Sequence, residues 1–466
     1  MEGVDAGYLY LETPTMHMHT LKIAIVEPRE QPFDLDHLTA EILARLEQLR
    51  PFRRRVLPPP LRLNHPLWLT DRRVELADHV FHHEVPAPGG MKGLEELIGR
   101  VSATPLDRSR PLWEMHVCQP FDDGRVAVVT KMHHALADGV AANALLGNLV
   151  DAVGDDVRPA RDRPRSDLPL ELTPTRLQQA RMALLDAITQ IGSLPGLLGR
   201  TVRAVVSLVA RRRVSEVTVP RPVLDVPRVL FNDALTARRN FATCTLSVAE
   251  IKEAQREHGV TMNDVVLAVV GGALRRWLLT RGELPERPLV AGVPVATDRP
   301  GAAPRLGGNR VSNLFTSLAT DVADPRERLL SISRTTGESK IVQRTLGPDM
   351  LVDWVQFAPP APLSAAMRLY SRSRAASRHP PPFNLVVSNV RGPGEEIQIS
   401  GAVLRDLFSV GPILEGIGMN VTAWSYCGRM NFSFLSCPDL VPDLAPLVAE
   451  LPRALYELRT TKGATT

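Results

Sequence analysis

Residues 131–139 read Lys-Met-His-His-Ala-Leu-Ala-Asp-Gly and contain the pattern H-H-x-x-x-D-G. The residues before it, 125–132, alternate around three valines, which predicts a strand. The residues after it, 139–150, carry apolar side chains at helical spacing, which predicts a helix. The pattern therefore lies where a strand passes into a helix, and such a position holds a reactive side chain firmly while leaving it exposed.

Length and composition indicate a soluble protein of two domains. The chain has 466 residues, and single cores stop growing beyond roughly 250–300 residues. Of its residues 44% are hydrophobic and 23% are charged, and the net charge of +4 argues against a dedicated nucleic-acid binder. We expect a cytoplasmic protein with reduced thiols, because its four cysteines form no C-x-x-C pair and the N-terminus lacks the apolar core of a signal peptide. No run of 18 uncharged apolar residues is present, so we expect no transmembrane helix.

The boundary between the domains is marked by a change of composition. Residues 155–174 are dominated by Asp, Arg and Pro and have no periodicity, as in a linker. We predict an N-terminal domain over residues 1–155, a linker over 156–224 and a C-terminal domain over 225–466. Strand and helix patterns alternate in both halves, which predicts two α/β sandwich domains.

The stretch from residue 176 to 213 is apolar and basic, and it predicts a long helical segment broken near residues 192–196, which include Pro195. Two interpretations stay open. The segment could lie on a membrane or lipid surface, as basic amphipathic helices do. Alternatively, it is a helix that packs between the two domains or frays in solution.

The motif has the composition of an acid–base site. A histidine at a strand end is a suitable general base near neutral pH, because its ordinary pKa of about 6.5 lets it take and return a proton. Asp138 could accept hydrogen bonds from the region of the imidazole, or it could pair with an arginine and hold the loop rigid. Gly139 would let the backbone turn tightly or approach a ligand closely.

Other kinds of site have less support. His133, His134 and Asp138 could supply three metal ligands, but no H-E-x-x-H or cysteine pair accompanies them. G-x-S-x-G is absent, and the glycine pairs at 271–272 and 307–308 form no phosphate loop. A second pair, His82-His83, has no following Asp-Gly and is interpreted as a strand-end or surface pair. A histidine pair without any chemistry remains the alternative to a catalytic one.

H-H-x-x-x-D-G resembles the motif of the CoA-dependent acyltransferase superfamily, which includes chloramphenicol acetyltransferases and peptide-synthetase condensation domains. Within it, the chain resembles the bacterial wax ester synthase/diacylglycerol acyltransferase family. Residues 5–12 and 309–312 match that family's motifs in order, and the resemblance extends from about residue 5 to about residue 455. The other matching segments are Pro111-Leu112-Trp113 for P-L-W, Asn263-Asp264 for N-D, and Ser388-Asn389-Val390-Arg391-Gly392-Pro393 for S-N-V-P-G-P, with Arg391 where proline is usual.

The resemblance implies a fold and a reaction. The fold would be two chloramphenicol-acetyltransferase-like α/β sandwich domains joined by a helical crossover linker, with an active-site tunnel at their interface. The reaction would be acyl-CoA-dependent O-acyl transfer of a long-chain fatty acyl group to diacylglycerol, to a fatty alcohol, or to both. His134 would be the general base and His133 would support it, with no covalent acyl-enzyme. Asp138 would pair with an arginine, and Arg108 and Arg110 are candidates by their proximity in the sequence.

The resemblance also implies substrates and a pocket. Acyl-CoA would be a co-substrate, with no permanently bound cofactor or metal, and the partner would be a hydrophobic alcohol, with possible peripheral contact to the inner membrane face or to lipid inclusions. Asn263 and Asn389 could donate hydrogen bonds to the oxyanion, or could instead cap a helix and close a turn. The remaining pocket candidates are Gly139, Pro111, Leu112, Trp113, Asp264 and Ser388. A non-catalytic lipid-binding or lipid-droplet protein, or an acyltransferase acting on another small alcohol, are the alternatives.

Overall fold

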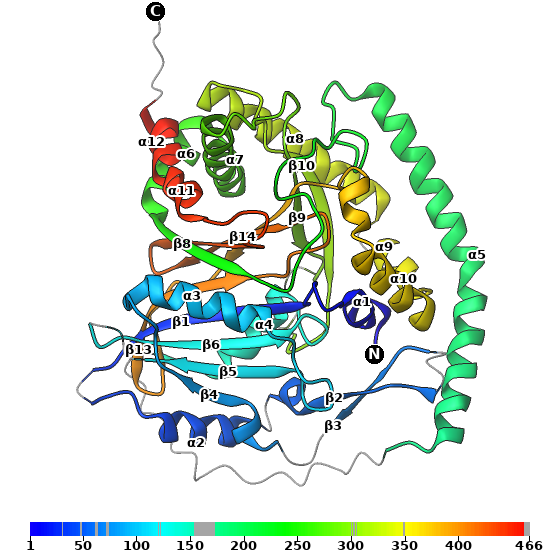
Figure 1. Ribbon diagram of the computed structural model, residues 1–466. Coiled ribbons are helices and arrows are strands. Elements are labelled where there is room, and N and C mark those ends of the chain that lie inside the picture. The colour runs from blue at the N-terminus through cyan, green and yellow to red at the C-terminus, as the bar shows by residue number, and fades with distance from the viewer. Residues whose placement is uncertain are drawn as a thin grey trace, which may run out of the picture.

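The computed structural model consists of two mixed β-sheets with helices packed on them, and one long helix that runs along the outside (Figure 1). It describes residues 1–29, 31–46, 49–60, 64–70, 74–119, 121, 123–152, 173–299, 301, 303, 305–347 and 350–460. The predicted α/β class is confirmed, because both sheets carry helical layers.

The first sheet has seven strands, and all neighbours pair antiparallel except β4 and β5. In spatial order the strands are β4 (Val80–His83), β5 (Trp113–Cys118), β6 (Val126–His133), β1 (His19–Glu27), β13 (Ala402–Val410), β12 (Ile397–Ile399) and β7 (Asp151–Ala152). Alternation along β1 gives the sheet two apolar faces. Ile23 packs in one cluster of buried residues with α3 (Gly90–Ala103), and Ala24 packs in another with α2 (Leu35–Arg45) and α4 (Gly139–Gly147).

Helices and a small hairpin surround this sheet. They are α1 (Gly3–Leu11), α2 (Leu35–Arg45), α3 (Gly90–Ala103), α4 (Gly139–Gly147), the 3-10 turns η1 (Arg50–Arg53) and η3 (Leu76–Asp78), and the paired strands β2 (Arg54–Leu57) and β3 (Leu67–Thr70). The predicted strand before the histidine motif and the predicted helix after it are therefore both present, as β6 and α4.

The second sheet has six strands, with parallel pairing of β9 to β11 and of β11 to β14. In spatial order the strands are β10 (Val311–Ser317), β9 (Val290–Ala296), β11 (Leu385–Arg391), β14 (Met419–Tyr426), β15 (Arg429–Ser436) and β8 (Asn240–Ser247). The helices of this half are α6 (Val248–His258), α7 (Met262–Thr280), α8 (Pro325–Leu346), α9 (Met350–Val355), α10 (Pro360–Arg372), the 3-10 turn η5 (Ala375–Arg378), α11 (Ala445–Val448) and α12 (Glu450–Thr460).

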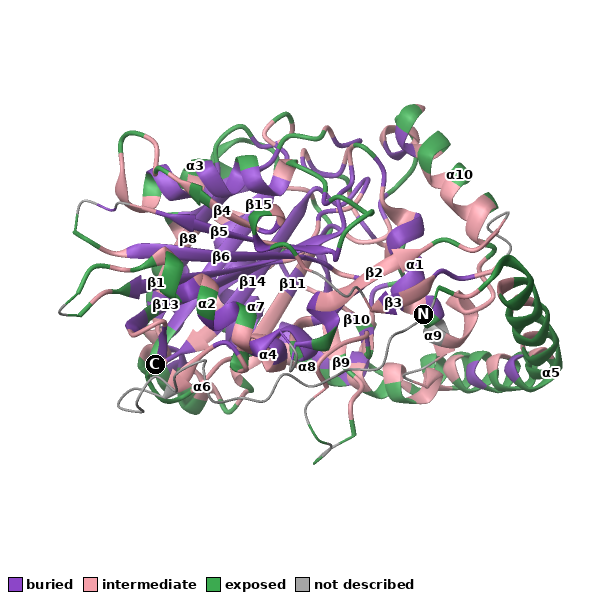
Figure 2. Cartoon of the chain, turned by 90° about the horizontal axis from the view of Figure 1, so that it is seen from below, coloured by how far each residue is buried: buried purple, intermediate pink, exposed green. Residues whose placement is uncertain are grey.

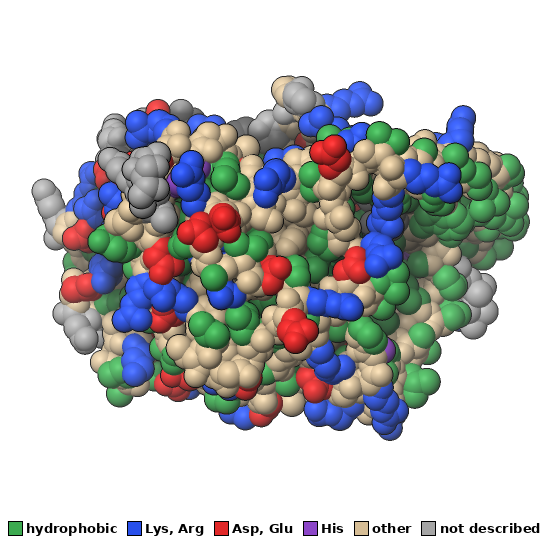
Figure 3. Space-filling view, turned by 90° about the horizontal axis from the view of Figure 1, so that it is seen from above, with side chains coloured by type: hydrophobic (Ala, Val, Ile, Leu, Met, Phe, Trp, Pro, Cys, Tyr) green, Lys and Arg blue, Asp and Glu red, His purple; other side chains and the backbone are tan. Residues whose placement is uncertain are grey.

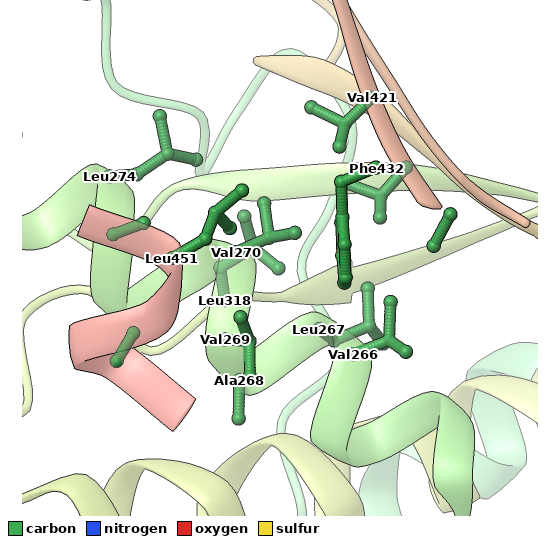
Figure 4. Packing of buried hydrophobic residues seen from close by; sticks show 14 of the residues in the cluster. Val266, Leu267, Ala268, Val269, Val270, Leu274, Leu318, Val421, Phe432 and Leu451 are labelled. Atoms are coloured by element: carbon green, nitrogen blue, oxygen red, sulfur yellow. The ribbon is translucent and has the colours of Figure 1, made fainter. Parts of the chain in front are cut away.

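The core of the second half is built around α7. This helix is apolar on nearly every side and is buried between the sheet and α12, as expected for a helix without a polar face. Figure 4 shows Leu267 below Phe432 of the sheet, and Leu451 of α12 beside Val270. Figure 2 shows that burial is concentrated in the two sheets.

Two strands from the C-terminal half complete the first sheet. β13 pairs with β1 over seven residue pairs, from Leu21 with Val410 to Glu27 with Val403. β12 joins β13 on one side and β7 on the other. Residues 397–410 therefore belong to the first sheet, although the predicted division into residues 1–155 and 225–466 assigns them to the C-terminal domain. A division of the sequence into contiguous segments could not place β12 and β13 in the first sheet, because strand pairing between distant segments leaves no local sequence pattern.

The linker contains α5 (Arg176–Val214), a single helix of 39 residues. The predicted break near residues 192–196 is wrong. Pro195 lies inside the helix; it removes one backbone N–H, and the remaining bonds of a long helix are enough to continue it. The interpretation that this helix packs between the two domains is also wrong, because only Leu197 and Ala204 of α5 are buried. Within the described residues, α5 is the one helix long and apolar enough to cross a membrane by length and composition.

Candidate active site

The two histidines are held by the backbone at the end of β6. The N–H of His133 donates to the carbonyl of Leu112 on one side, over 3.0 Å. The N–H of His134 donates to the carbonyl of Met18 on the other side, over 2.7 Å. The motif is therefore fixed between two neighbouring strands before the chain enters α4.

His133 is fully buried, and its tautomer follows from its two partners. The backbone N–H of Ala135 donates to Nδ1 over 3.1 Å, so this nitrogen carries no proton. The proton is therefore on Nε2, which donates to Glu12 Oε2 over 3.2 Å. Both ring nitrogens are engaged, so His133 is not available to a substrate.

Glu12 links the motif to α1 and to the segment before β5. Burial raises the pKa of this carboxyl, but the hydrogen bonds from His133 and Arg108 and the charge of Arg108 outweigh burial and lower the pKa to about 2. Arg108 is thus paired with Glu12, and Arg110 with Asp78 over 2.8 Å. Neither arginine is paired with Asp138, so both proximity-based candidates are wrong.

His134 has the opposite tautomer, and Asn309 determines it. The amide nitrogen of Asn309 donates to Asp5 Oδ1 and to the backbone carbonyl of His134, each over 2.8 Å. Both partners are acceptors, so the amide oxygen of Asn309 must face Nδ1 of His134, 3.1 Å away. Nδ1 therefore carries the proton, and Nε2 of His134 keeps a free lone pair.

The ring of His134 is held in a stacked position and stays neutral. Tyr8 of α1 stacks on it, with ring centroids 4.2 Å apart and planes inclined by 17°. Burial lowers the pKa of His134 to about 4, against the opposing effects of Asp138 and Asn309. Burial likewise raises the pKa of Asp5, behind Asn309, to about 6. At neutral pH the imidazole is uncharged and able to accept a proton.

Asp138 determines the geometry of the loop and does not touch the imidazole. One carboxylate oxygen accepts from the N–H of Ala141 over 2.9 Å and so caps α4. The other accepts from Nη2 of Arg305 and from the N–H of Arg310, each over 2.7 Å. Of the two roles considered for Asp138, pairing with an arginine is the one present, and Arg305 is that arginine.

The segment 305–310 joins the second half of the chain to the motif. Arg305 also binds Asp298, with Nε 2.6 Å from Oδ1. Backbone bonds run from Gly308 N–H to the Leu136 carbonyl over 2.8 Å and from Asp138 N–H to the Gly308 carbonyl over 3.3 Å. The motif loop is therefore supported from both halves of the molecule.

Several predicted pocket residues have structural roles. Gly139 does not adopt a positive φ, and a Cβ there would meet nothing within 4 Å, which leaves open space beside α4. Leu112 and Trp113 are fully buried. The Trp113 ring lies between Phe52 and His79 at centroid distances of 4.7 and 4.5 Å. With Pro111, these two residues anchor the start of β5.

The N-D and S-N-V segments meet at the ends of α7 and β11. Nδ2 of Asn389 is 3.5 Å from Oδ1 of Asn263, so the structure brings these two predicted residues together. Asp264 forms a capping box with Thr261 at the start of α7, and its carboxylate is used there. Ser388 pairs with Thr422 in the second sheet.

The second histidine pair ends β4, as predicted, and Nε2 of His83 lies 2.9 Å from Nδ1 of His116. Among the described residues, no group of three His, Cys, Asp or Glu side chains could hold a metal ion.

Two pockets flank the motif. One is lined by Leu136 of the motif loop and by Asp5 and Asn309 on the Nδ1 side of His134, and it also contains Arg50, Arg54 and Arg310. The other is mainly apolar and lies between the first sheet, α2 and α4, with the buried Lys22 at one side. Lys22 donates to Ser409 Oγ over 2.6 Å, and burial lowers its pKa to about 7. Neither of these two pockets is lined by Pro111, Leu112 or Trp113.

The sequence analysis assigned no role to several residues whose side chains hold the motif. Tyr8, Glu12, Arg305 and Asn309 contact the motif histidines or Asp138, and Asp5 holds Asn309; all five were missed. Four of them lie in residues 5–12 and 309–312, the two segments that matched family motifs without any assigned role. Arg305 lies 167 residues from Asp138 and had no such signal.

Comparison with known proteins gives matches along most of the chain. The family model described as "Wax ester synthase/diacylglycerol acyltransferase catalytic domain" matches residues 1–266, and the "WS/DGAT C-terminal domain" matches residues 307–459. A putative diacylglycerol O-acyltransferase of Mycobacterium tuberculosis is 34% identical over 467 residues, covering 99% of this chain and 96% of the relative. A probable diacylglycerol O-acyltransferase of the same organism is 34% identical over 462 residues, covering 98% of each chain.

Solved structures give the same result for the fold. The wax ester synthase/diacylglycerol acyltransferase from Marinobacter aquaeolei VT8 superposes with a TM-score of 0.67 at 27% identity, covering 98% of this chain and 97% of that one. The first condensation domain of the CDA synthetase superposes with a TM-score of 0.58 at 16% identity, covering 99% and 96%. The predicted fold of two acyltransferase-like sandwich domains is confirmed.

Proposed function

Because this chain belongs to the wax ester synthase/diacylglycerol acyltransferase family, we propose that it transfers a long-chain acyl group from acyl-CoA to a hydrophobic alcohol. The acceptor is diacylglycerol, a fatty alcohol, or both, and the product is a triacylglycerol or a wax ester. We place the reaction in the cytoplasm, at a lipid surface where such acceptors collect. One observation carries the chemistry: the neutral His134 ring keeps Nε2 free while Asn309 holds the proton on Nδ1.

The proposed reaction needs one base and no covalent acyl-enzyme. Nε2 of His134 takes the proton of the alcohol hydroxyl as its oxygen attacks the thioester carbonyl carbon. The tetrahedral oxyanion then collapses, the C–S bond breaks, and the CoA sulfur leaves with the proton that the imidazole had taken. Asn263 and Asn389 are the proposed hydrogen-bond donors to the oxyanion, a contribution commonly worth about 3 kcal/mol.

The experiment that tests this proposal is release of CoA from a long-chain acyl-CoA in the presence of diacylglycerol or a fatty alcohol. We expect His134→Ala to lower kcat by at least about a hundredfold, because it removes the base. His82→Ala is the matched control, since His82 is exposed at the end of β4. Activity of His134→Ala near that of the wild type would contradict the proposal.

The same assay distinguishes the alternatives. A non-catalytic lipid-binding protein would release no CoA with any alcohol, although it would bind the lipid. A protein that only bound lipid would need neither the free Nε2 of His134 nor the Arg305–Asp138 pair. The presence of both features therefore supports the enzyme. An acyltransferase for another small alcohol would respond only to that alcohol in a screen with one fixed acyl-CoA.

The cationic pocket beside His134 is the proposed site for the phosphates of CoA. Arg50, Arg54 and Arg310 line it, and their side chains have no ion-pair partner within the described part of the chain. Arginine is well suited to phosphate because its planar guanidinium can donate two hydrogen bonds in parallel. The pocket is lined by Asp5 and Asn309, which lie on the Nδ1 side of His134, so CoA phosphates held there would be close to the residue that supplies the base.

A phosphate-free substrate tests this assignment. We expect Arg50→Ala with Arg54→Ala to raise KM for acyl-CoA by about tenfold, on the scale of one to two charge-assisted hydrogen bonds. The KM for the corresponding acyl-pantetheine, which lacks the nucleotide and its phosphates, should stay unchanged. Arg326→Ala, an exposed change on α8, is the control. Equal losses with both substrates would contradict the assignment.

A further inference from the structure

We propose that α5 is a docking helix that lies flat on an anionic phospholipid surface. The proposal deepens the proposed function by naming the element that brings the enzyme to a lipid surface. Figure 1 shows α5 on the outside of the molecule, alongside α9 and α10. Figure 2 shows it exposed along most of its length. Of its 18 most apolar consecutive residues, 6% are buried.

Most of the exposed apolar side chains of α5 form one stripe. At about 100° per residue, six of them fall within an arc of roughly 80°. They are Leu184, Ile188, Ile191, Leu198, Val202 and Val206, and each is 51% exposed or more, with Ile191 at 66%. The two buried side chains, Leu197 and Ala204, lie roughly 150° away by the same spacing. The stripe therefore faces away from the protein, and it extends for about 33 Å at 1.5 Å per residue.

This stripe differs from a soluble surface. Apolar residues are normally scattered over a protein surface, and large continuous exposed patches mark interaction sites. Figure 3 shows hydrophobic side chains gathered at the right-hand end of the molecule, where α5 lies. A helix with a long apolar face and a basic remainder is typical of segments that lie in the plane of a lipid interface.

The charge of α5 selects an anionic partner. The helix has seven arginines and one acidic residue, Asp186, which accepts a hydrogen bond from Asn64. Arg200 and Arg211 are paired with Asp353 and Glu338. The other arginines make no ion pair or hydrogen bond within the described residues: Arg176, Arg181, Arg203, Arg212 and Arg213. They lie near both ends and beside the stripe, where they would meet lipid phosphates.

Contacts along α5 exclude a membrane-spanning orientation for this structure. Asp186 is held by Asn64, Arg200 by Asp353, and Thr201 Oγ1 accepts from Trp354 Nε1 over 3.0 Å. Near the C-terminal end Nε of Arg211 donates to Glu338 over 2.7 Å. Because these contacts fix the inner face of the helix to the protein, only its outer face can enter lipid.

The test is co-sedimentation of the full-length protein with vesicles of phosphatidylcholine alone or of phosphatidylcholine mixed with phosphatidylglycerol, whose negative surface attracts basic segments. We expect binding to the anionic vesicles and at least tenfold weaker binding to the neutral ones. Val202→Asp with Val206→Asp should reduce binding to the anionic vesicles at least tenfold. Leu279→Asp, at an exposed leucine of α7, is the matched control and should bind as the wild type does.

Two further measurements separate docking from folding and from catalysis. Thermal unfolding should be alike for the wild type and both variants, since the changed side chains face outward. Turnover of a short-chain acyl-CoA with a water-soluble alcohol should also be unchanged, even if the enzyme prefers other acceptors. The proposal is overturned if the wild type binds neither vesicle, if the α5 variant still binds, or if sedimentation velocity shows α5 instead joining two copies of the chain.

Discussion

The two motif histidines differ in which nitrogen carries the proton, and this difference assigns their roles. His133 uses Nδ1 to accept from Ala135 and Nε2 to donate to Glu12. His134 donates from Nδ1 to Asn309 and keeps Nε2 free. A pair of identical residues thus divides into a support and a base through their backbone and amide partners.

Removing the amide that fixes the tautomer should therefore slow catalysis. In Asn309→Ala, Nδ1 of His134 loses its acceptor, so the ring can rotate and the proton can move to Nε2. We expect kcat to fall roughly ten- to a hundredfold, less than the roughly hundred- to ten-thousandfold contribution of a positioned base, because the imidazole itself remains. Asn313→Ala, at an exposed residue of β10, is the matched control for the CoA-release assay. An unchanged kcat in Asn309→Ala would contradict this role.

The pKa of His134 leads to a second prediction at this scale. Burial favours the neutral ring and lowers the pKa to about 4, so the form with a free Nε2 lone pair persists below the ordinary histidine range. Because the pKa is lowered, the pH at which the base becomes protonated and activity is lost also moves to lower values. We expect kcat/KM for acyl-CoA to remain level from pH 8 to 6.5. An acid limb with a midpoint at pH 6.5 or above would contradict this prediction.

Among the elements, those with local signals were predictable. The strand-to-helix passage at β6 and α4 followed from valine alternation and apolar spacing, and the amphipathic segment at residues 176–213 was helical as predicted. The partners of the motif were not predictable, because Arg305 and Asn309 approach it only through tertiary structure from 167 and 175 residues away. For the same reason, the pairing of β13 with β1 could not be predicted from the sequence. At Pro195 the helix continues through a residue that usually ends one, because the hydrogen bonds of the turns on either side hold it.

The S-N-V-R-G-P segment illustrates what an element requires of one residue. Arg391 still pairs with Ser425 in the second sheet, so replacing the usual proline leaves β11 intact. Gly392 has no room for a side chain, since a Cβ would overlap the Ser425 carbonyl oxygen and the Trp424 indole nitrogen. The glycine therefore lets the end of β11 approach β14.

Gly392→Ala should displace this strand end and Asn389 with it. We expect a loss of about 1–3 kcal/mol in the free energy of unfolding, the usual cost of overpacking. Chemical denaturation measures the stability, and CoA release should fall in parallel because Asn389 shifts. Gly394→Ala is the control two residues on, where a Cβ would meet nothing within 4 Å. Equal stability of the two variants would contradict the close-approach argument.

At the scale of the whole molecule, β13 makes the two halves depend on each other. β1 is a central strand only while β13 pairs with it, and without β13 the residues from Leu21 to Glu27 would present an unpaired edge. We therefore predict that residues 1–152, produced alone, show no cooperative thermal unfolding, whereas residues 1–152 co-produced with 173–466 purify together and unfold cooperatively. The co-produced pair also controls for the break in the chain, because it has the same ends. A cooperative transition for residues 1–152 alone would mean that the N-terminal segment folds independently and that β13 only covers its edge.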